Sequence, residues 1–183
     1  MTEVRSTNSD SWAQVYIEGA KEKGFLPEHL QCNYTENITR AEFASILVRF
    51  IEAYSKKSID SILWENQLPL MSVPFDDALF IDVDYVYRLG IAQGRTGKTY
   101  DPLANITREE AAVMMTRMLN ILGKDTSAYN YNLPAISEWA VDSVNFVYEK
   151  GIMQGTDDGF DPRGNITKQQ YITALYRIYY NVK

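Results

Sequence analysis

The tripeptide Asn-Ile-Thr occurs three times in the sequence, and the same pattern of apolar residues follows each copy. The copies begin at Asn37, Asn105 and Asn165. Apolar residues recur 4, 7, 8, 11, 12 and 15 positions after each threonine, which is the spacing of one face of an α-helix. These positions hold Phe43, Ile46, Leu47, Phe50, Ile51 and Tyr54; Ala111, Met114, Met115, Met118, Leu119 and Leu122; and Tyr171, Ala174, Leu175, Ile178, Tyr179 and Val182. The repetition predicts three related units that bury one core together.

Each long helix also carries its own start signal. A threonine precedes the apolar pattern, and a Glu or Gln follows it three residues later. This spacing is typical of a capping box, in which the two side chains satisfy free backbone N–H groups of the first turn. The pairs are Thr39 with Glu42, Thr107 with Glu110, and Thr167 with Gln170.

A shorter helix is predicted upstream of each long one. The three segments are residues 12–23, 78–89 and 139–150, and each ends at a glycine that can terminate a helix. In the second and third copies a Gly-Ile-x-x-Gly segment follows, closed by Gly94 and Gly155, and then an aromatic-Asp-Pro sequence. The first copy has Cys32 in the place of the aromatic residue, so Cys32 is interpreted as a small buried hydrophobe.

The predicted fold is all-α, with three helix–loop–helix repeats packed around a pseudo-threefold axis. We expect more than half of the chain to be helical, with no substantial sheet. The repeats are assigned to residues 10–54, 75–122 and 135–183, joined by connections at 55–74 and 123–134, the first with an extra turn near 59–64.

Composition excludes several functions. A net charge of −6 argues against a general nucleic-acid binder. The single Cys32 and the single His29 exclude an intramolecular disulfide, a cysteine-rich zinc site and a multi-histidine metal site. No catalytic set, cofactor motif, membrane span or signal peptide is visible, so the chain is expected to be no enzyme and to need no cofactor.

The residue after each capping threonine is a cation: Arg40, Arg108 or Lys168. A positive charge in the first turn opposes the helix dipole, and its repetition suggests a function. Helix N-termini with free N–H groups beside a cation favour an anion site. On this hypothesis removal of the cation does not lower stability. Alternatively, each cation pairs with an acidic neighbour from the next repeat.

Two further sets of residues stay open at this stage. A second cation recurs ten residues after each threonine, at Arg49, Arg117 and Arg177, where an inter-repeat salt bridge is favoured over a ligand contact. Trp12 and Trp139 fit either a core position or a platform for a sugar ring equally well.

These motifs resemble a known family. Ile-Thr-Arg-Ala-Glu-Phe at 38–43 and Ile-Thr-Arg-Glu-Glu-Ala at 106–111 are similar to the signature of S-layer homology domains, as are the Trp-Ala pairs, the Gly-Ile-x-x-Gly segments and the aromatic-Asp-Pro sequences. The resemblance implies a three-pronged helical fold that attaches extracellular proteins to bacterial cell walls. The implied ligand is a secondary cell-wall polysaccharide, often with pyruvate ketals, bound in grooves between repeats.

The resemblance also implies which residues bind. By position, the carbohydrate-binding residues are Arg40, Arg108, Lys168, Trp12, Trp139 and Asp77, with Gly94 and Gly155 of the glycine-rich loops. The third repeat departs from the signature at Lys168 and Gln170, and the second has Ala78 in place of Trp. We therefore expect at most two competent grooves, with the site around Lys168 the weakest.

The resemblance implies a cell-surface location and a place in a larger surface protein. The missing export signal then suggests a fragment or a processed form. Two alternatives remain: a structural or protein-interaction module of the same fold without a polysaccharide site, and an enzyme, for which no paired carboxylates are visible.

Overall fold

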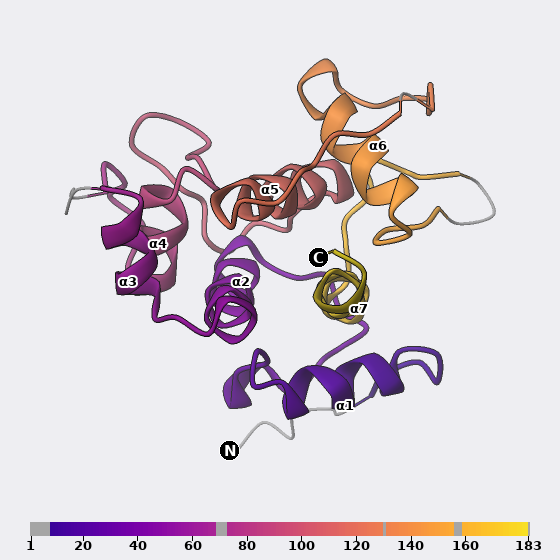
Figure 1. The fold of residues 1–183 in the computed structure, drawn as a ribbon, viewed down its shortest axis with the longest axis horizontal. Helices are drawn as coiled ribbons and strands as arrows, with labels where there is room; N and C mark the ends of the chain where they lie inside the picture. Colours follow the sequence, from indigo (N-terminus) through magenta and orange to yellow (C-terminus); the bar gives the residue numbers. More distant parts are fainter. Residues whose placement is uncertain (1–7, 69–72, 130, 156–158, 183) are drawn as a thin grey trace.

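The structure is a computed structural model that describes residues 8–68, 73–129, 131–155 and 159–182. Three helical prongs surround a central group of long helices (Figure 1). The elements are α1 (Gln14–Glu22), η1 (Glu28–Leu30), α2 (Arg40–Ser55), α3 (Ile59–Glu65), α4 (Ile81–Arg88), α5 (Arg108–Ile121), η2 (Glu138–Ala140), α6 (Val141–Glu149) and α7 (Lys168–Asn181). The described part is all-α, as predicted, but helices occupy slightly less than half of it and not more than half. The short helices begin two or three residues later than expected and end one residue earlier, and long loops join the elements.

The three long helices α2, α5 and α7 form the centre. Each begins with the predicted capping box, including the one that uses Gln170 instead of glutamate. Fifteen of the eighteen apolar positions are buried in one continuous core. The other three, Tyr54, Leu122 and Tyr179, are partly buried against it. The helical pattern therefore predicted the core correctly.

Each long helix packs mainly against the short helix of the next repeat. The principal contacts are α2 with α4, α5 with α6, and α7 with α1 (Figure 1). The last pair brings the beginning and the end of the chain together and closes the ring of three repeats. A helix–loop–helix repeat is thus a unit of sequence, whereas each packed helix pair joins two repeats.

Three isoleucines of the Asn-Ile-Thr triplets meet where the repeats converge. Ile38 donates its backbone N–H to the carbonyl of Ile166 at 3.1 Å, Ile166 donates to Ile106 at 3.1 Å, and Ile106 donates to Ile38 at 3.3 Å. All three side chains are fully buried. These hydrogen bonds belong to three isolated bridges, and the described residues contain no β-strand. The triplet therefore serves two purposes: it caps a helix and closes a backbone ring around the pseudo-threefold axis.

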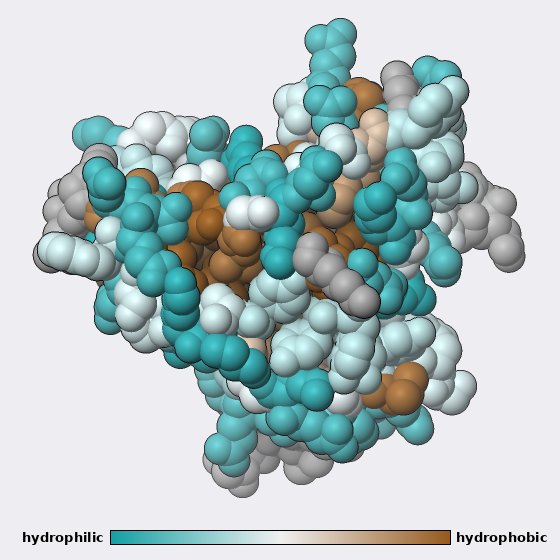
Figure 2. Space-filling view, in the orientation of Figure 1, coloured by the Kyte–Doolittle hydropathy of each residue, from teal (hydrophilic) through white to brown (hydrophobic). Residues whose placement is uncertain are grey.

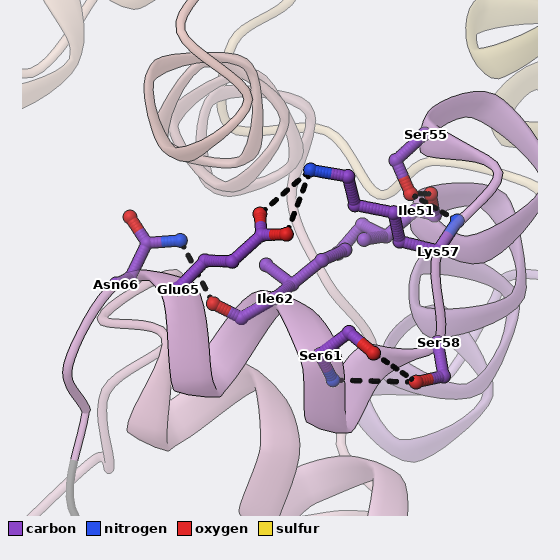
Figure 3. A network of polar contacts seen from close by, with 8 residues as sticks. All are labelled: Ile51, Ser55, Lys57, Ser58, Ser61, Ile62, Glu65 and Asn66. Carbon is purple, nitrogen blue, oxygen red and sulfur yellow. Dashed lines mark hydrogen bonds and ion pairs between the residues drawn. The ribbon is translucent and has the colours of Figure 1, made fainter.

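The first connection contains the expected extra turn as α3. Ser58 caps this helix by accepting a hydrogen bond from the backbone N–H of Ser61. Lys57 forms an ion pair with Glu65 at 2.7 Å, and Asn66 closes the C-terminal end by donating to the carbonyl of Ile62 at 2.9 Å (Figure 3). Local polar contacts thus fix both ends of the insertion.

The surface is mostly polar on the outer parts of the prongs. Figure 2 shows hydrophobic residues gathered in the hollows around the centre of this face. Across the described ranges, none of the helices has both the length and the apolar character needed to span a membrane.

Candidate functional site: two grooves between repeats

The two arginines that follow the capping threonines cross to the next repeat. Arg40 donates through Nε to the carbonyl of Tyr100 at 3.0 Å and through Nη2 to that of Gln93 at 2.8 Å. Its guanidinium also lies 4.4 Å from the centre of the Tyr100 ring. Only 5% of Arg40 is exposed. Arg40 therefore joins repeats 1 and 2 as well as lining a cavity described below.

Arg108 repeats this arrangement between repeats 2 and 3. Nε donates to the carbonyl of Phe160 at 2.8 Å, Nη2 donates to that of Gln154 at 2.6 Å, and the guanidinium lies 4.9 Å from the centre of the Phe160 ring. Burial lowers the pKa of the Arg108 guanidinium, but arginine stays charged in proteins. Each arginine keeps a second Nη group with two further N–H donors.

The backbone N–H groups at the helix N-termini are already bonded, and this corrects the anion-site hypothesis. The N–H groups of Arg40 and Ala41 donate to the carbonyls of Ala104 and Pro102, both at 2.9 Å. The first turns of α5 and α7 make the equivalent bonds to the preceding loops of repeats 3 and 1. The helix ends are satisfied by protein, so any anion specificity must come from side chains.

A cavity of about 350 Å³, which we call the Trp139 groove, lies between repeats 2 and 3. It brings together Arg40, Gly94 and Trp139, three of the residues that the family resemblance implies as ligand-binding, although the resemblance did not say which of them share a groove. Trp139 is 59% exposed and is therefore not a core residue. The lining residues are Arg40, Ile91, Ala92, Gln93, Gly94, Arg95, Glu110, Val113, Met114, Arg117 and Trp139.

A second cavity of about 200 Å³, the Trp12 groove, lies between repeats 3 and 1. It brings Arg108, Gly155 and Trp12 together, and Trp12 is 46% exposed. The lining residues are Trp12, Arg108, Ile152, Met153, Gln154, Gly155, Ile166, Gln170, Thr173 and Arg177. Most of them occupy the same repeat positions as those of the Trp139 groove, so two equivalent sites are built from three repeats.

The two loop glycines are required by close backbone contacts. A Cβ atom on Gly94 would lie 2.6 Å from the carbonyl oxygen of Thr96, and one on Gly155 would lie 2.6 Å from that of Gly159. Neither backbone atom can move away without opening the turn. The glycines shape the groove walls through these tight turns.

Each tryptophan-bearing loop is held by the residue that follows the cation. Glu109 accepts hydrogen bonds from the backbone N–H and the hydroxyl of Ser137 at 3.0 and 2.8 Å, two residues before Trp139. Gln169 exchanges two hydrogen bonds with Asp10, two residues before Trp12. Sequence reasoning missed Glu109 and Gln169. The signal was their shared position two residues after the capping threonine.

The predicted inter-repeat salt bridge ten residues after the threonine is found at one of the three positions. Arg49 forms the expected inter-repeat salt bridge with Asp82 at 3.2 Å. Arg117 and Arg177 instead donate to backbone carbonyls within their own repeats and line the two grooves. The sequence favoured the salt bridge over a ligand contact at all three positions, and the groove linings support the second alternative for Arg117 and Arg177.

Lys168 lines neither groove. Its ammonium donates to the carboxylate of Glu42 at 2.9 Å and to the carbonyl of Cys32 at 3.2 Å, and 3% of the residue is exposed. The alternative of an acidic partner from another repeat is therefore correct here. Gln170, the other departure of the third repeat from the family signature, lines the Trp12 groove. Cys32 is buried, as expected.

Asp77 also lies outside the linings of both grooves. Its carboxylate accepts hydrogen bonds from the backbone N–H groups of Tyr100 and Asp101 at 2.7 and 2.8 Å, and these bonds lower the pKa of Asp77. The residue holds the turn that carries Tyr100 under Arg40. Within the described ranges, no group of three or more His, Cys, Asp or Glu side chains could hold a metal ion.

Comparisons with known proteins show which proteins the chain is similar to. The S-layer homology domain family matches residues 76–112 and 133–172. An endoglucanase from Bacillus sp. (strain KSM-635) is 30% identical over 115 residues, which is 62% of this chain and 12% of the enzyme. S-layer protein sap from Bacillus anthracis is 29% identical over 107 residues, which is 58% of this chain and 13% of that protein.

The chain thus corresponds to a small part of each of these relatives, and the shared segment contains the repeats rather than the whole of either protein. An endoglucanase and an S-layer protein thus each share a segment of similar length with this chain. Together with the all-α architecture, these matches show that the chain contains S-layer homology domain sequence at residues 76–112 and 133–172.

Proposed function

We propose that this chain is a cell-surface anchoring module that binds an acidic cell-wall polysaccharide in the Trp12 and Trp139 grooves. The observation that carries this proposal is the duplication of one side-chain set at two junctions. Each groove combines a buried arginine, a half-exposed tryptophan, a second arginine and a tight glycine turn.

The chemistry of this set suits a sugar that carries a carboxylate. The exposed face of an indole packs against the C–H face of a pyranose ring. A guanidinium can donate two parallel hydrogen bonds to a carboxylate, such as that of a pyruvate ketal. The chain as a whole carries a net charge of −6, so its grooves concentrate cations on an otherwise acidic molecule.

The two grooves have the same net lining charge but differ in the charged groups that contribute to it. Both contain two arginines at equivalent positions, but the Trp139 groove also contains Arg95 and Glu110, which form an ion pair with each other. In the Trp12 groove the neutral Gln170 stands in place of Glu110. A carboxylate ligand therefore meets no acidic lining residue in the Trp12 groove, and we expect that groove to bind more tightly.

The third junction, between repeats 1 and 2, is proposed to be inactive. At this junction Lys168 and Ala78 occupy the positions of the groove arginine and the groove tryptophan. Lys168 is engaged by Glu42, and Ala78 stands where the other junctions have tryptophan. The module is then bivalent, located at the outer surface of a bacterium, and part of a larger surface protein. Its partner is the wall polysaccharide, and it carries out no catalysis itself.

Sedimentation with purified bacterial cell walls tests the proposal. The unaltered chain should co-sediment with walls, and mild acid removal of ketals should abolish this. Trp12→Ala and Trp139→Ala should each reduce the calorimetric stoichiometry for a synthetic pyruvylated hexosamine glycoside from two to one, and the double variant should not bind. Trp64→Ala is the matched control, because Trp64 is 84% exposed on α3 and lines neither groove.

Two results would contradict the proposal. Equal binding of the double variant would mean that the grooves are not the site. Failure of the unaltered chain to bind walls or the glycoside would favour a structural or protein-interaction module of the same fold.

A further inference from the structure

A tyrosine-lined cavity adjoins the Trp12 groove. It has a volume of about 450 Å³ and is lined by Tyr16, Gly151, Gln154, Tyr176, Arg177, Tyr180 and Asn181. We propose that this tyrosine cavity is an outer carbohydrate subsite, which binds sugar rings further along the chain whose end occupies the Trp12 groove. The inference rests on the proposed function and extends it.

The cavity is continuous with the groove through two shared residues. Gln154 and Arg177 line both spaces. The Arg177 guanidinium lies 5.4 Å from the centre of the Tyr16 ring and donates to the carbonyl of Ile152 at 3.3 Å, so backbone and aromatic contacts hold it at the boundary. A polysaccharide that leaves the groove on this side passes directly over the tyrosines.

The tyrosine rings form a connected platform. Tyr16 and Tyr176 meet edge to face with their centres 5.6 Å apart, and Tyr176 and Tyr180 lie 4.8 Å apart. Tyr180 is 49% exposed. Aromatic rings with accessible faces and polar hydroxyls offer both stacking and hydrogen bonds, the combination that a sugar ring requires.

Gly19 of α1 makes room for this platform. A Cβ atom at Gly19 would lie 2.1 Å from Cε2 of the Tyr176 ring. Glycine within a helix is disfavoured relative to alanine. Its presence at this contact allows one edge of the Tyr176 ring to approach α1 closely, so a larger residue at position 19 would displace the ring.

The equivalent cavity beside the Trp139 groove has no tyrosine. It has a volume of about 530 Å³ and is lined by Val113, Thr116, Arg117, Asn120, Thr126, Ser127, Ala128, Trp139, Asp142 and Ser143. By repeat position, Ser143 replaces Tyr16, Thr116 replaces Tyr176 and Asn120 replaces Tyr180. The two grooves are therefore expected to hold the same terminal sugar but to differ in their affinity for a longer chain.

Single-groove variants test the subsite by calorimetry. In the Trp139→Ala background only the Trp12 groove remains, and a trisaccharide ending in the pyruvylated unit should bind more tightly than the pyruvylated monosaccharide glycoside. Tyr176→Thr with Tyr180→Asn installs the residues of the other cavity. We expect this change to weaken trisaccharide binding on the order of tenfold and to leave monosaccharide binding unchanged.

The same double substitution in the Trp12→Ala background is the control and should alter neither affinity. Circular dichroism checks that each variant is folded. If the double variant unfolds, Tyr180→Asn alone takes its place in the comparison, because Tyr180 is half-exposed. If the Trp139→Ala protein binds the monosaccharide, and the tyrosine substitutions leave its trisaccharide affinity unchanged, the subsite is overturned but the proposed function is not. Absence of binding by both sugars to the unaltered chain would overturn both.

Discussion

Lys168 in the last repeat donates to Glu42 in the first, Nζ to Oε1, at a distance of 2.9 Å. In the Trp12 groove the same two repeat positions hold Arg108 and Gln170, and there they line a cavity. The Lys168 ammonium also binds the carbonyl of Cys32. The ion pair makes the third junction a structural contact, and its removal should affect stability rather than binding.

We expect Lys168→Met to lower the free energy of unfolding by about 2 kcal/mol, because the Glu42 carboxylate and the Cys32 carbonyl lose a partner in a largely buried place. Glu42→Gln keeps the helix cap, as Gln170 does in the third repeat, and so isolates the ion pair. Urea denaturation of both single variants and the double variant gives the coupling energy. Loss of a binding site in Lys168→Met would contradict this assignment.

Arg40→Ala and Arg108→Ala should each destabilise the fold, by roughly 2 to 4 kcal/mol. Each guanidinium makes two hydrogen bonds to backbone carbonyls of the next repeat and packs on an aromatic ring. Removal of the unfavourable dipole interaction offsets only a small part of this. Thermal and urea denaturation provide the measurement. Arg163→Ala, at an exposed position, is the control and should change stability by less than about 0.5 kcal/mol.

Tyr100 makes stability sensitive to alkaline pH. Burial raises the pKa of Tyr100 to about 12, above the ordinary tyrosine value of about 10. Below pH 10 the phenol is neutral in both states. As the pH rises from 10 towards 12, the unfolded state loses its proton while the folded state keeps it, so stability falls by about 2 to 3 kcal/mol.

Tyr100→Phe is a matched test, because Phe160 already occupies this position in the third repeat. Among the described residues the buried Tyr100 hydroxyl has no hydrogen-bond partner. The variant should therefore be as stable as the parent at neutral pH and lose less stability between pH 10 and 12. Urea denaturation of both proteins at several pH values measures this loss. If the parent and Tyr100→Phe lose the same stability between pH 10 and 12, the effect belongs to other tyrosines.

Met115→Asp should unfold the chain. Met115 is fully buried on α5 in the core shared by the three repeats, and an unpaired carboxylate there costs several kcal/mol. Met115→Leu conserves most of the volume and should cost less than about 1.5 kcal/mol. Circular dichroism distinguishes the two. A folded Asp variant would mean that the central helices do not share one core.

The sequence determined the helices, their caps and their buried faces, because these depend on residues within about one turn of each other. The tertiary structure decided which repeats meet. It placed Arg40 and Trp139 in one groove and Arg108 and Trp12 in the other, although the members of each pair lie about a hundred positions apart in the sequence. It also used the N–H groups of Arg40 and Ala41 for carbonyls of the next repeat. Spacing within one repeat cannot specify such contacts, since they arise only when the ring closes and the short helix of one repeat packs on the long helix of another.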